Sequence, residues 1–275
     1  MIDLHAHTRR SDGTDTPREL MERARDAGLT VLGLTDHDTC AGWEEAAEAV
    51  RDTGVALVRG MELTCRHAGR TVHLLGYLFN PDHPAIGAHM DRLIAARHLR
   101  IVNMAEALIA DGLIAPTDLD LDSPALGRPH IADALVRAGQ VADRPEAFAT
   151  YIHPTSRYHR PLPAPSLAET ITTIHDAGGA AVWAHPRAKR HGQHSFDAIR
   201  EGLSFGLDGL EIDHRDNSSA DREKLETLAQ AYGVLKTGAS DYHGSGKPNE
   251  LGENCTSEEV LGALTERTEL EVIYP

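Results

Sequence analysis

Short apolar segments recur along this chain of 275 residues, and nearly every one of them leads into a histidine, aspartate or glutamate. Amphipathic helical patterns separate most of these segments, so that strands and helices alternate. The alternation predicts βαβ units and a parallel sheet, and we expect an α/β fold of about seven or eight steps, a (β/α) barrel or a close relative. The predicted strands lie at residues 1–4, 30–34, 55–58, 71–77, 180–183, 207–212 and 234–237, with a last extended run at 269–274.

The first helix has a clear start signal. Thr16-Pro-Arg-Glu19 reads as a capping box with proline at the first helical position, and Gly28 marks the expected end. A helix is therefore expected directly after the first group of polar residues.

The stretch between Tyr77 and Ala180 is too long for one helix with its loops. It holds a long amphipathic pattern at residues 91–111, helical patterns near 129–138 and 145–152, and the segment TSRYHRPLPAP. We expect residues 92–165 to form a helical insertion that caps one end of a barrel built from residues 1–91 and 166–275.

Composition excludes several classes of partner. The formal net charge of −15 argues against binding to duplex DNA or to an anionic membrane, but not against a small phosphorylated substrate. No apolar run is long enough for a membrane helix, and polar residues occupy the place of a signal peptide's apolar region. Cys40, Cys65 and Cys255 form no CxxC pair. A reduced, cytoplasmic location is therefore expected, and no obligate protein partner is evident.

The chain contains 17 histidines, and many of them follow the predicted strands. A single histidine after a strand is more often structural than functional. Histidines that recur after nearly every strand do indicate a functional site, because the carboxyl ends of parallel strands meet at one face of a barrel. We predict that nine residues converge there as metal ligands: His5, His7, Asp12, His37, Glu62, His73, His185, Asp241 and His243.

Imidazoles with a few carboxylates suit Mn²⁺, Fe²⁺ or Zn²⁺ better than Mg²⁺ or Ca²⁺. Nine ligands are too many for one ion, so we expect two or three divalent ions, most simply Mn²⁺, with Glu62 as a bridge. Two such ions hold a hydroxide and neutralise the oxygens of an in-line displacement at phosphorus. The sequence has no GxSxG elbow, P-loop or GxGxxG motif that would favour another mechanism.

The ordered motifs HAHTRRSDGTDTP, LTDHDTCAG, GMELT, VHLLGY, AHP and SDYHG resemble those of the PHP (polymerase and histidinol phosphatase) family of metal-dependent phosphoesterases. The resemblance spans nearly the whole chain and implies a distorted (β/α)7 barrel with a trinuclear centre at its mouth. It implies three ligand sets. They are His5, His7, Glu62 and Asp241; Asp12, His37 and His243; and Glu62, His73 and His185.

Within the family, the insertion and GRPHIADAL resemble a standalone group of 3',5'-nucleoside bisphosphate phosphatases and AMP phosphatases, some of which act as 5'-to-3' exonucleases on short oligoribonucleotides. The chain departs from that group at SRYHRPLPAP. Arg128, His130 and Arg157 in the insertion are candidates for binding substrate phosphate, with solvated surface charge as the alternative for both arginines. The run PRAKRH at 186–191 could attract a polyanion or be a solvated loop. We expect Asp36 and Asp38 to orient imidazoles.

These observations predict an enzyme that hydrolyses phosphomonoesters of nucleotides or short oligonucleotides through a metal-bound hydroxide. His243, Asp241 and His37 are the candidate catalytic residues, and His243 or a metal-bound water would protonate the leaving oxygen. The alternatives are a histidinol-phosphate-type phosphatase, an amidohydrolase-like C–N hydrolase, and a degenerate metal-binding module. The amidohydrolase alternative lacks a lysine at a strand end to bridge metals, and a degenerate copy would usually have lost ligands.

Overall fold

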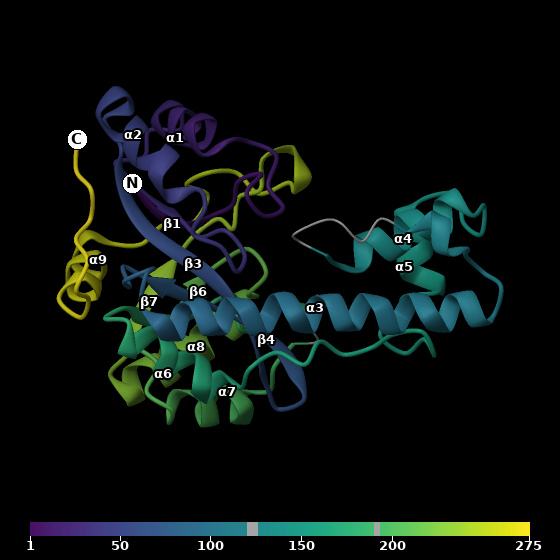
Figure 1. Ribbon diagram of the computed structural model, residues 1–275. Helices are drawn as coiled ribbons and strands as arrows, with labels where there is room; N and C mark the ends of the chain where they lie inside the picture. The colour runs from purple at the N-terminus through teal and green to yellow at the C-terminus, as the bar shows by residue number, and fades with distance from the viewer. Residues whose placement is uncertain (120–125, 190–192) are drawn as a thin grey trace. The chain divides into compact units, whose positions relative to one another are not determined.

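The computed structural model describes residues 1–119, 126–189 and 193–275 of the chain. These residues form two compact units. Met1–His89 and Pro165–Pro275 make up the first, and Met90–Ala164 make up the second. All the strands formed by these residues lie in the first unit, which we call the barrel unit (Figure 1).

Seven strands follow one another in chain order across a single sheet. They are β1 (Ile2–Ala6), β2 (Val31–Leu34), β3 (Ala56–His67), β4 (Arg70–Tyr77), β5 (Ala180–Trp183), β6 (Gly209–Asp213) and β7 (Leu235–Gly238). The sheet curls until the end of β1 meets the segment after β7, where the His7 amide donates to the Tyr242 carbonyl at 2.8 Å. The prediction of a distorted seven-stranded barrel is confirmed.

The direction of β4 corrects the expectation of a parallel sheet, because β4 pairs antiparallel with both β3 and β5. Only Ala68 and Gly69 separate β3 from β4, and both have positive φ, 47° and 76°. A two-residue connection can join only antiparallel strands. The predicted third strand was also too short, since β3 continues past Val58 and contains Glu62. Glu62 therefore enters the site from within a strand and not from a loop after it, and His73 lies within β4 as predicted.

The helices of the barrel unit pack outside the sheet. Figure 1 shows α1 (Pro17–Asp26) and α2 (Trp43–Thr53) side by side, apart from the group α6 (Leu167–Asp176), α7 (Phe196–Leu203) and α8 (Ser219–Tyr232); α9 (Glu258–Thr265) is the last helix. The predicted capping box of α1 is confirmed. The Thr16 hydroxyl accepts from the Glu19 amide at 3.0 Å, and the Glu19 carboxylate accepts from the Thr16 amide at 2.8 Å.

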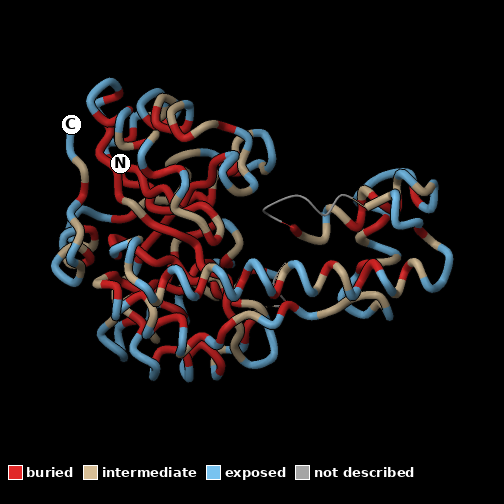
Figure 2. Tube along the Cα trace, in the orientation of Figure 1, coloured by how far each residue is buried: buried red, intermediate tan, exposed pale blue. Residues whose placement is uncertain are grey.

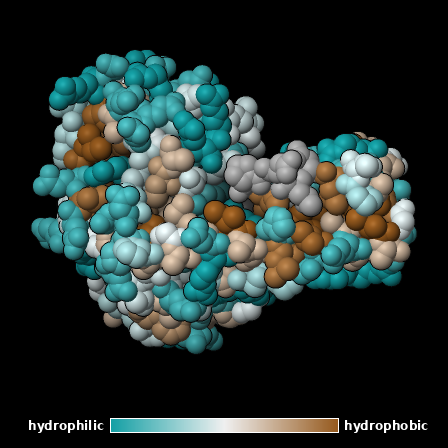
Figure 3. Space-filling view, viewed as in Figure 1, coloured by the Kyte–Doolittle hydropathy of each residue, from teal (hydrophilic) through white to brown (hydrophobic). Residues whose placement is uncertain are grey.

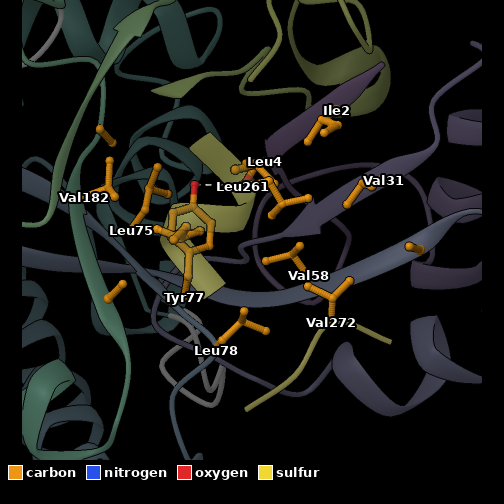
Figure 4. Packing of buried hydrophobic residues seen from close by; sticks show 14 residues of the cluster. Ile2, Leu4, Val31, Val58, Leu75, Tyr77, Leu78, Val182, Leu261 and Val272 are labelled. Carbon is orange, nitrogen blue, oxygen red and sulfur yellow. Dashed lines mark hydrogen bonds between the residues drawn. The ribbon is translucent and has the colours of Figure 1, made fainter. Parts of the chain in front are cut away.

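The core of the barrel unit is made of side chains from most of its strands (Figure 4). Leu4, Val58, Leu75, Tyr77 and Val182 are all fully buried. The Tyr77 hydroxyl donates to the Leu4 carbonyl at 3.1 Å, which satisfies its polar atom inside the core. Figure 2 shows that burial extends over nearly the whole sheet. Full burial of one such apolar side chain contributes about 1.5–3 kcal/mol, so the strands form a rigid support for residues at their ends.

The second unit is helical and has an apolar core of its own. It contains most of α3 (Pro84–Ala110), the 3₁₀ turn η1 (Pro116–Asp118), α4 (Arg128–Arg137) and α5 (Arg144–Thr150). Ile101, Leu108, Ile131 and Leu135 are fully buried in its core. α3 begins earlier than the pattern at 91–111 suggested, with Pro84 at its first position.

Hydrophilic residues cover most of the visible face of the barrel unit (Figure 3). In the described part of the chain, no helix is both long enough and apolar enough to cross a membrane.

Candidate metal centre

The first predicted ligand set comes together inside the barrel unit. His5 and His7 extend from β1, Glu62 from β3, and Asp241 from the segment after β7. The Nε2 atoms of His5 and His7 lie 3.0 Å apart, as expected for histidines at alternate positions of one strand. Glu62 Oε2 lies 3.2 and 3.0 Å from these two nitrogens, and Asp241 Oδ1 lies 3.3 Å from each.

These separations match the donor set of a tetrahedral metal site. Ligand atoms about 2.0–2.1 Å from a metal ion stand about 3.3 Å apart along the edges of a tetrahedron. Glu62 Oε2 is buried and makes no hydrogen bond among the described residues, although both imidazoles are in contact with it. The four ligand atoms therefore face a common point, but they do not satisfy one another fully with hydrogen bonds. This arrangement fits a divalent cation.

A second group contains His7, Asp12, His37 and His243. Asp12 Oδ1 lies 3.2 Å from His243 Nε2, and Asp12 Oδ2 lies 3.7 Å from His37 Nε2. The His243 Nδ1–H donates to the Asp241 carbonyl at 2.8 Å, so its Nε2 is the nitrogen that faces Asp12. The Asp12 side chain is 54% exposed, whereas those of His5 and His7 are fully buried. The centre therefore opens to solvent on the Asp12 side.

Glu62 connects the remaining histidines. Its Oε1 lies 2.7 Å from His73 Nδ1 and 3.2 Å from His185 Nε2, and its Oε2 lies 3.1 Å from His37 Nδ1. His37, Glu62 and His73 form a further group whose ligand atoms lie within 4.8 Å of one another. All nine predicted ligands thus meet in one cluster, with Glu62 in contact with five imidazoles.

The electrostatics of the cluster also favour a cation. Burial lowers the pKa of His5 and His7, but the nearby carboxylates outweigh it and hold the pKa of His5 well above its usual value and that of His7 at about 9. Burial raises the pKa of Glu62 and Asp241, yet the surrounding imidazoles keep both well below the usual range. For His37, burial prevails and the pKa falls well below its usual value. The carboxylates are therefore ionised and are balanced by the protonated imidazoles of His5 and His7, a buried positive charge that a divalent ion can replace.

Three residues at the cluster have backbone conformations that are unfavourable for residues with a side chain. Asp38, His185 and Asp241 have positive φ values of 51°, 29° and 56°. Such conformations are costly for residues other than glycine and persist where the surrounding structure enforces them, often at functional sites.

The two aspartates next to His37, Asp36 and Asp38, stabilise the loops of the site through hydrogen bonds. Asp36 accepts from the Thr8 amide at 2.7 Å and from the Ser11 hydroxyl at 2.6 Å, so its contact with an imidazole is indirect. It acts one step away, because the Ser11 hydroxyl lies 3.5 Å from His7 Nδ1. Asp38 accepts from the Thr64 amide at 2.7 Å and thereby joins the end of β2 to β3.

Sequence reasoning missed three side chains at the cluster: Glu211 on β6, His214 after it, and Lys247 after β7. Glu211 and His214 are fully buried, and the Lys247 ammonium lies 3.2 Å from Asp241 Oδ2. The available signal for Glu211 was an acidic residue between Leu210 and Ile212 in an apolar segment.

The predicted phosphate-binding residues lie in the second unit. The Arg128 guanidinium stands 5.2 Å from the centre of the Phe148 ring, and burial lowers its pKa. His130 Nδ1 accepts from the Gly127 amide at 3.1 Å. Arg157 pairs with Asp111 and stacks on Tyr158, so its charge is already partnered. In the run PRAKRH, Arg190 and His191 lie outside the described residues.

Comparison with known proteins agrees with this geometry. A model of the PHP domain matches residues 3–121. The chain is 33% identical to a 5'-3' exoribonuclease of Haemophilus influenzae over 92% of its own length and 93% of that protein. It is 32% identical to a 3',5'-nucleoside bisphosphate phosphatase of Chromobacterium violaceum, covering 90% of this chain and 88% of that one. A solved structure from Bifidobacterium adolescentis, described as a metal-dependent phosphoesterase, superposes with a TM-score of 0.85 at 40% identity, covering 98% of this chain and 96% of the other.

The barrel, its buried cluster of imidazoles and carboxylates, and these relatives define the class as metal-dependent hydrolases that act on phosphate esters. The chain belongs to the PHP family, and the predicted family resemblance is confirmed.

Proposed function

We propose that this PHP phosphoesterase hydrolyses phosphomonoesters of nucleotides, either nucleoside monophosphates or 3',5'-bisphosphates, or shortens small oligonucleotides. The observation that carries the proposal is the cluster of nine donors, whose ligand atoms in the first set stand 3.0–3.3 Å apart. The relatives named above, which act on bisphosphates and on RNA, support nucleotides as the substrate class.

The donor set supports two or three divalent ions, and its imidazoles and carboxylates suit Mn²⁺, with Fe²⁺ or Zn²⁺ as alternatives. We assign His5, His7, Glu62 and Asp241 to one ion, Asp12, His37 and His243 to a second, and Glu62, His73 and His185 to a third. When bound, such ions lower the pKa of a water molecule and neutralise phosphate oxygens.

The catalytic roles of the chain's own residues follow from their hydrogen bonds. The Nδ1–H of His243 is held by the Asp241 carbonyl, so we assign the other nitrogen to metal binding and leave protonation of the leaving oxygen to water. His37 and Asp12 lie at the more exposed side of the cluster, where a substrate phosphate would enter. Asp241 Oδ1 lies 3.3 Å from the Nε2 atoms of His5 and His7, so we assign it to the same ion as these two nitrogens.

Arg128 is our preferred phosphate-binding residue in the second unit. Arg100, Arg128 and Arg160 all lie close enough to His159 to lower its pKa, in addition to the effect of burial. A group of guanidinium ions suits bidentate binding of a phosphate. The assignments of His130 and Arg157 stay predictions, as do the cytoplasmic location and the lack of an obligate protein partner.

Substitution of Arg128 tests this assignment. Arg128→Met should raise KM about tenfold for a nucleotide substrate and change kcat less than about threefold, because it removes a binding contact made alike in ground and transition states. Arg144→Met, which removes a guanidinium of the same unit that is already paired with Asp133, is the matched control and should leave KM within about twofold. Equal effects of the two variants would contradict the assignment.

A substrate panel tests the proposed function. Purified protein loaded with Mn²⁺ is given nucleoside monophosphates, a 3',5'-bisphosphate, a short 5'-phosphorylated RNA, histidinol phosphate, and amide and cyclic urea substrates. We expect a kcat/KM at least about tenfold higher for one of the nucleotides or the RNA than for any other substrate. Preference for histidinol phosphate, or turnover of the C–N substrates alone, would overturn the proposal in favour of those alternatives.

A further inference from the structure

Glu211 is a buried carboxylate that belongs to none of the assigned ligand sets. It lies on β6, its side chain has 0% exposure, and its two oxygens have different partners. Oε1 lies 2.9 Å from Nδ1 of His5, and Oε2 accepts from the backbone amide of His185 at 2.8 Å. One side chain of β6 therefore holds two predicted ligands that come from β1 and from the end of β5.

We propose that Glu211 is a positioning residue that fixes His5 and His185 for metal binding; the inference rests on the metal centre proposed above. A carboxylate only accepts hydrogen bonds, so it selects the His5 tautomer that carries its proton on Nδ1. The Nε2 lone pair then faces His7, Glu62 and Asp241. Carboxylates that bind the far nitrogen of a ligand histidine orient the ring and raise its basicity.

The contact with His185 serves the same purpose through the backbone. His185 has a φ of 29°, a conformation that is unfavourable for a residue with a side chain. The Glu211 carboxylate accepts the amide of this residue, and the His185 Nε2 lies 3.2 Å from Glu62 Oε1. Loss of the carboxylate would release the amide and allow the His185 ring to turn away from Glu62.

Glutamine cannot replace Glu211 in either orientation of its amide. If its oxygen faces His5, its NH₂ group meets the His185 amide, and two donors oppose each other. If the oxygen faces His185, the NH₂ group meets His5 Nδ1, and the proton of His5 must move to Nε2. The nitrogen that should bind the metal would then carry a proton.

Asp208 provides a matched control on the same part of the chain. It directly precedes β6 and accepts a backbone amide and an imidazole, those of Ala181 at 2.8 Å and His175 at 2.7 Å, and it also pairs with the Arg267 guanidinium at 3.1 Å. None of these three partners is a predicted metal ligand. Asp208→Asn should therefore lower stability through the loss of partly buried polar contacts, without changing metal affinity.

The experiment compares the wild-type chain, Glu211→Gln and Asp208→Asn. Affinity for Zn²⁺ is measured by competition with a chelator, and the ligand field is measured by the visible absorption of the Co²⁺-loaded protein. Glu211→Gln should bind the metal about 10–100-fold more weakly and show an altered Co²⁺ spectrum, whereas Asp208→Asn should match wild type in both. If Glu211→Gln binds as tightly as wild type with the same spectrum, or if Asp208→Asn is impaired equally, the proposal is overturned.

A measurement on wild-type protein keeps the proposal testable if Glu211→Gln does not fold. In ¹H–¹⁵N NMR spectra of the Zn²⁺-loaded protein, His5 should carry its proton on Nδ1 in a strong hydrogen bond; a proton on Nε2 would overturn the inference. Wild-type protein that binds no divalent ion would overturn the metal centre itself. Tight binding that is insensitive to Glu211 would overturn only its positioning role.

Discussion

The two oxygens of Asp241 show how single residues divide the work of the site. Oδ1 faces His5 and His7, each at 3.3 Å, and takes part in the first ligand set. Oδ2 faces away from them, toward the Lys247 ammonium at 3.2 Å and His214 Nε2 at 3.9 Å. The positive charge of Lys247 also helps to hold the pKa of Asp241 well below its usual value, after the larger effect of His5 and His7. Lys247 thus keeps the carboxylate ionised and limits its rotation.

Removal of the Lys247 ammonium should weaken metal binding. We expect Lys247→Met to bind divalent metal about tenfold less tightly than wild type. Loss of a residue that contacts a metal ligand typically lowers metal affinity by about 10–100-fold, and we expect the smaller value because the Lys247 side chain is partly exposed. Competition with a chelator measures the change. Lys236→Met on β7 is the control, since it removes an equal charge from a side chain without a contact to the cluster in the described residues. Indistinguishable affinities of Lys247→Met and wild type would exclude this role.

At the scale of elements, the start of α1 is decided by local sequence. Thr16 and Glu19 exchange hydrogen bonds at the first turn, and Pro17 occupies the first position. The loop that carries Asp12 directly precedes α1, so the residue at which the helix begins also sets where this loop ends. The cap therefore contributes stability and also fixes the length of the ligand-bearing loop.

Loss of the α1 cap should cost stability. Thr16→Ala should lower the free energy of unfolding by about 1 kcal/mol, because the Glu19 amide loses its acceptor. In a chain of this size that corresponds to a fall in Tm of roughly 2–4 °C, measurable by thermal denaturation. Thr16→Ser, which keeps the hydroxyl, should stay close to wild type. A Thr16→Ala protein as stable as wild type would show that the cap contributes nothing.

The strands and the residues at their ends show which features of the fold and site can be predicted from the sequence and which cannot. His5 and Asp241 were predictable because a side chain that can bind a metal ion, next to a short apolar segment, is a signal that can be read from a few neighbouring residues. The antiparallel direction of β4 was missed because strand periodicity is the same in both directions; the two-residue gap at Ala68 and Gly69 would have indicated it had β3 been given its full length. Glu211 was missed because its role depends on contacts with residues 206 and 26 positions away.

At the scale of the whole molecule, ion pairs far from the metal centre set part of the pH dependence of folding. His175 on α6 binds Asp208 at 2.7 Å, and this hydrogen bond raises the pKa of His175 above its ordinary 6.5. The pair connects α6 to the segment before β6. Since protonated His175 is favoured in the folded state, its contribution is complete below the unfolded pKa and is lost as pH rises through the folded one.

Comparison of wild type with His175→Gln tests this linkage. The difference in unfolding free energy should be largest near about pH 6 and should shrink toward about pH 9, with a maximum of at most about 1 kcal/mol because the histidine is partly exposed. Chemical denaturation in chelator-containing buffer measures it without interference from bound metal. A difference that grows as pH rises would reverse the sign and contradict the assignment.

Metal content measured together with phosphate release tests the central claim most directly. Chelator-treated protein is titrated with Mn²⁺, and bound metal per chain and hydrolysis of a nucleoside bisphosphate are recorded at each step. We expect at least two ions per chain at saturation and activity that rises only as the second ion binds. Asp12→Ala, which leaves the buried first set intact, should bind about one ion fewer and be inactive. Full phosphate release by the metal-free protein, or by Asp12→Ala, would contradict the claim.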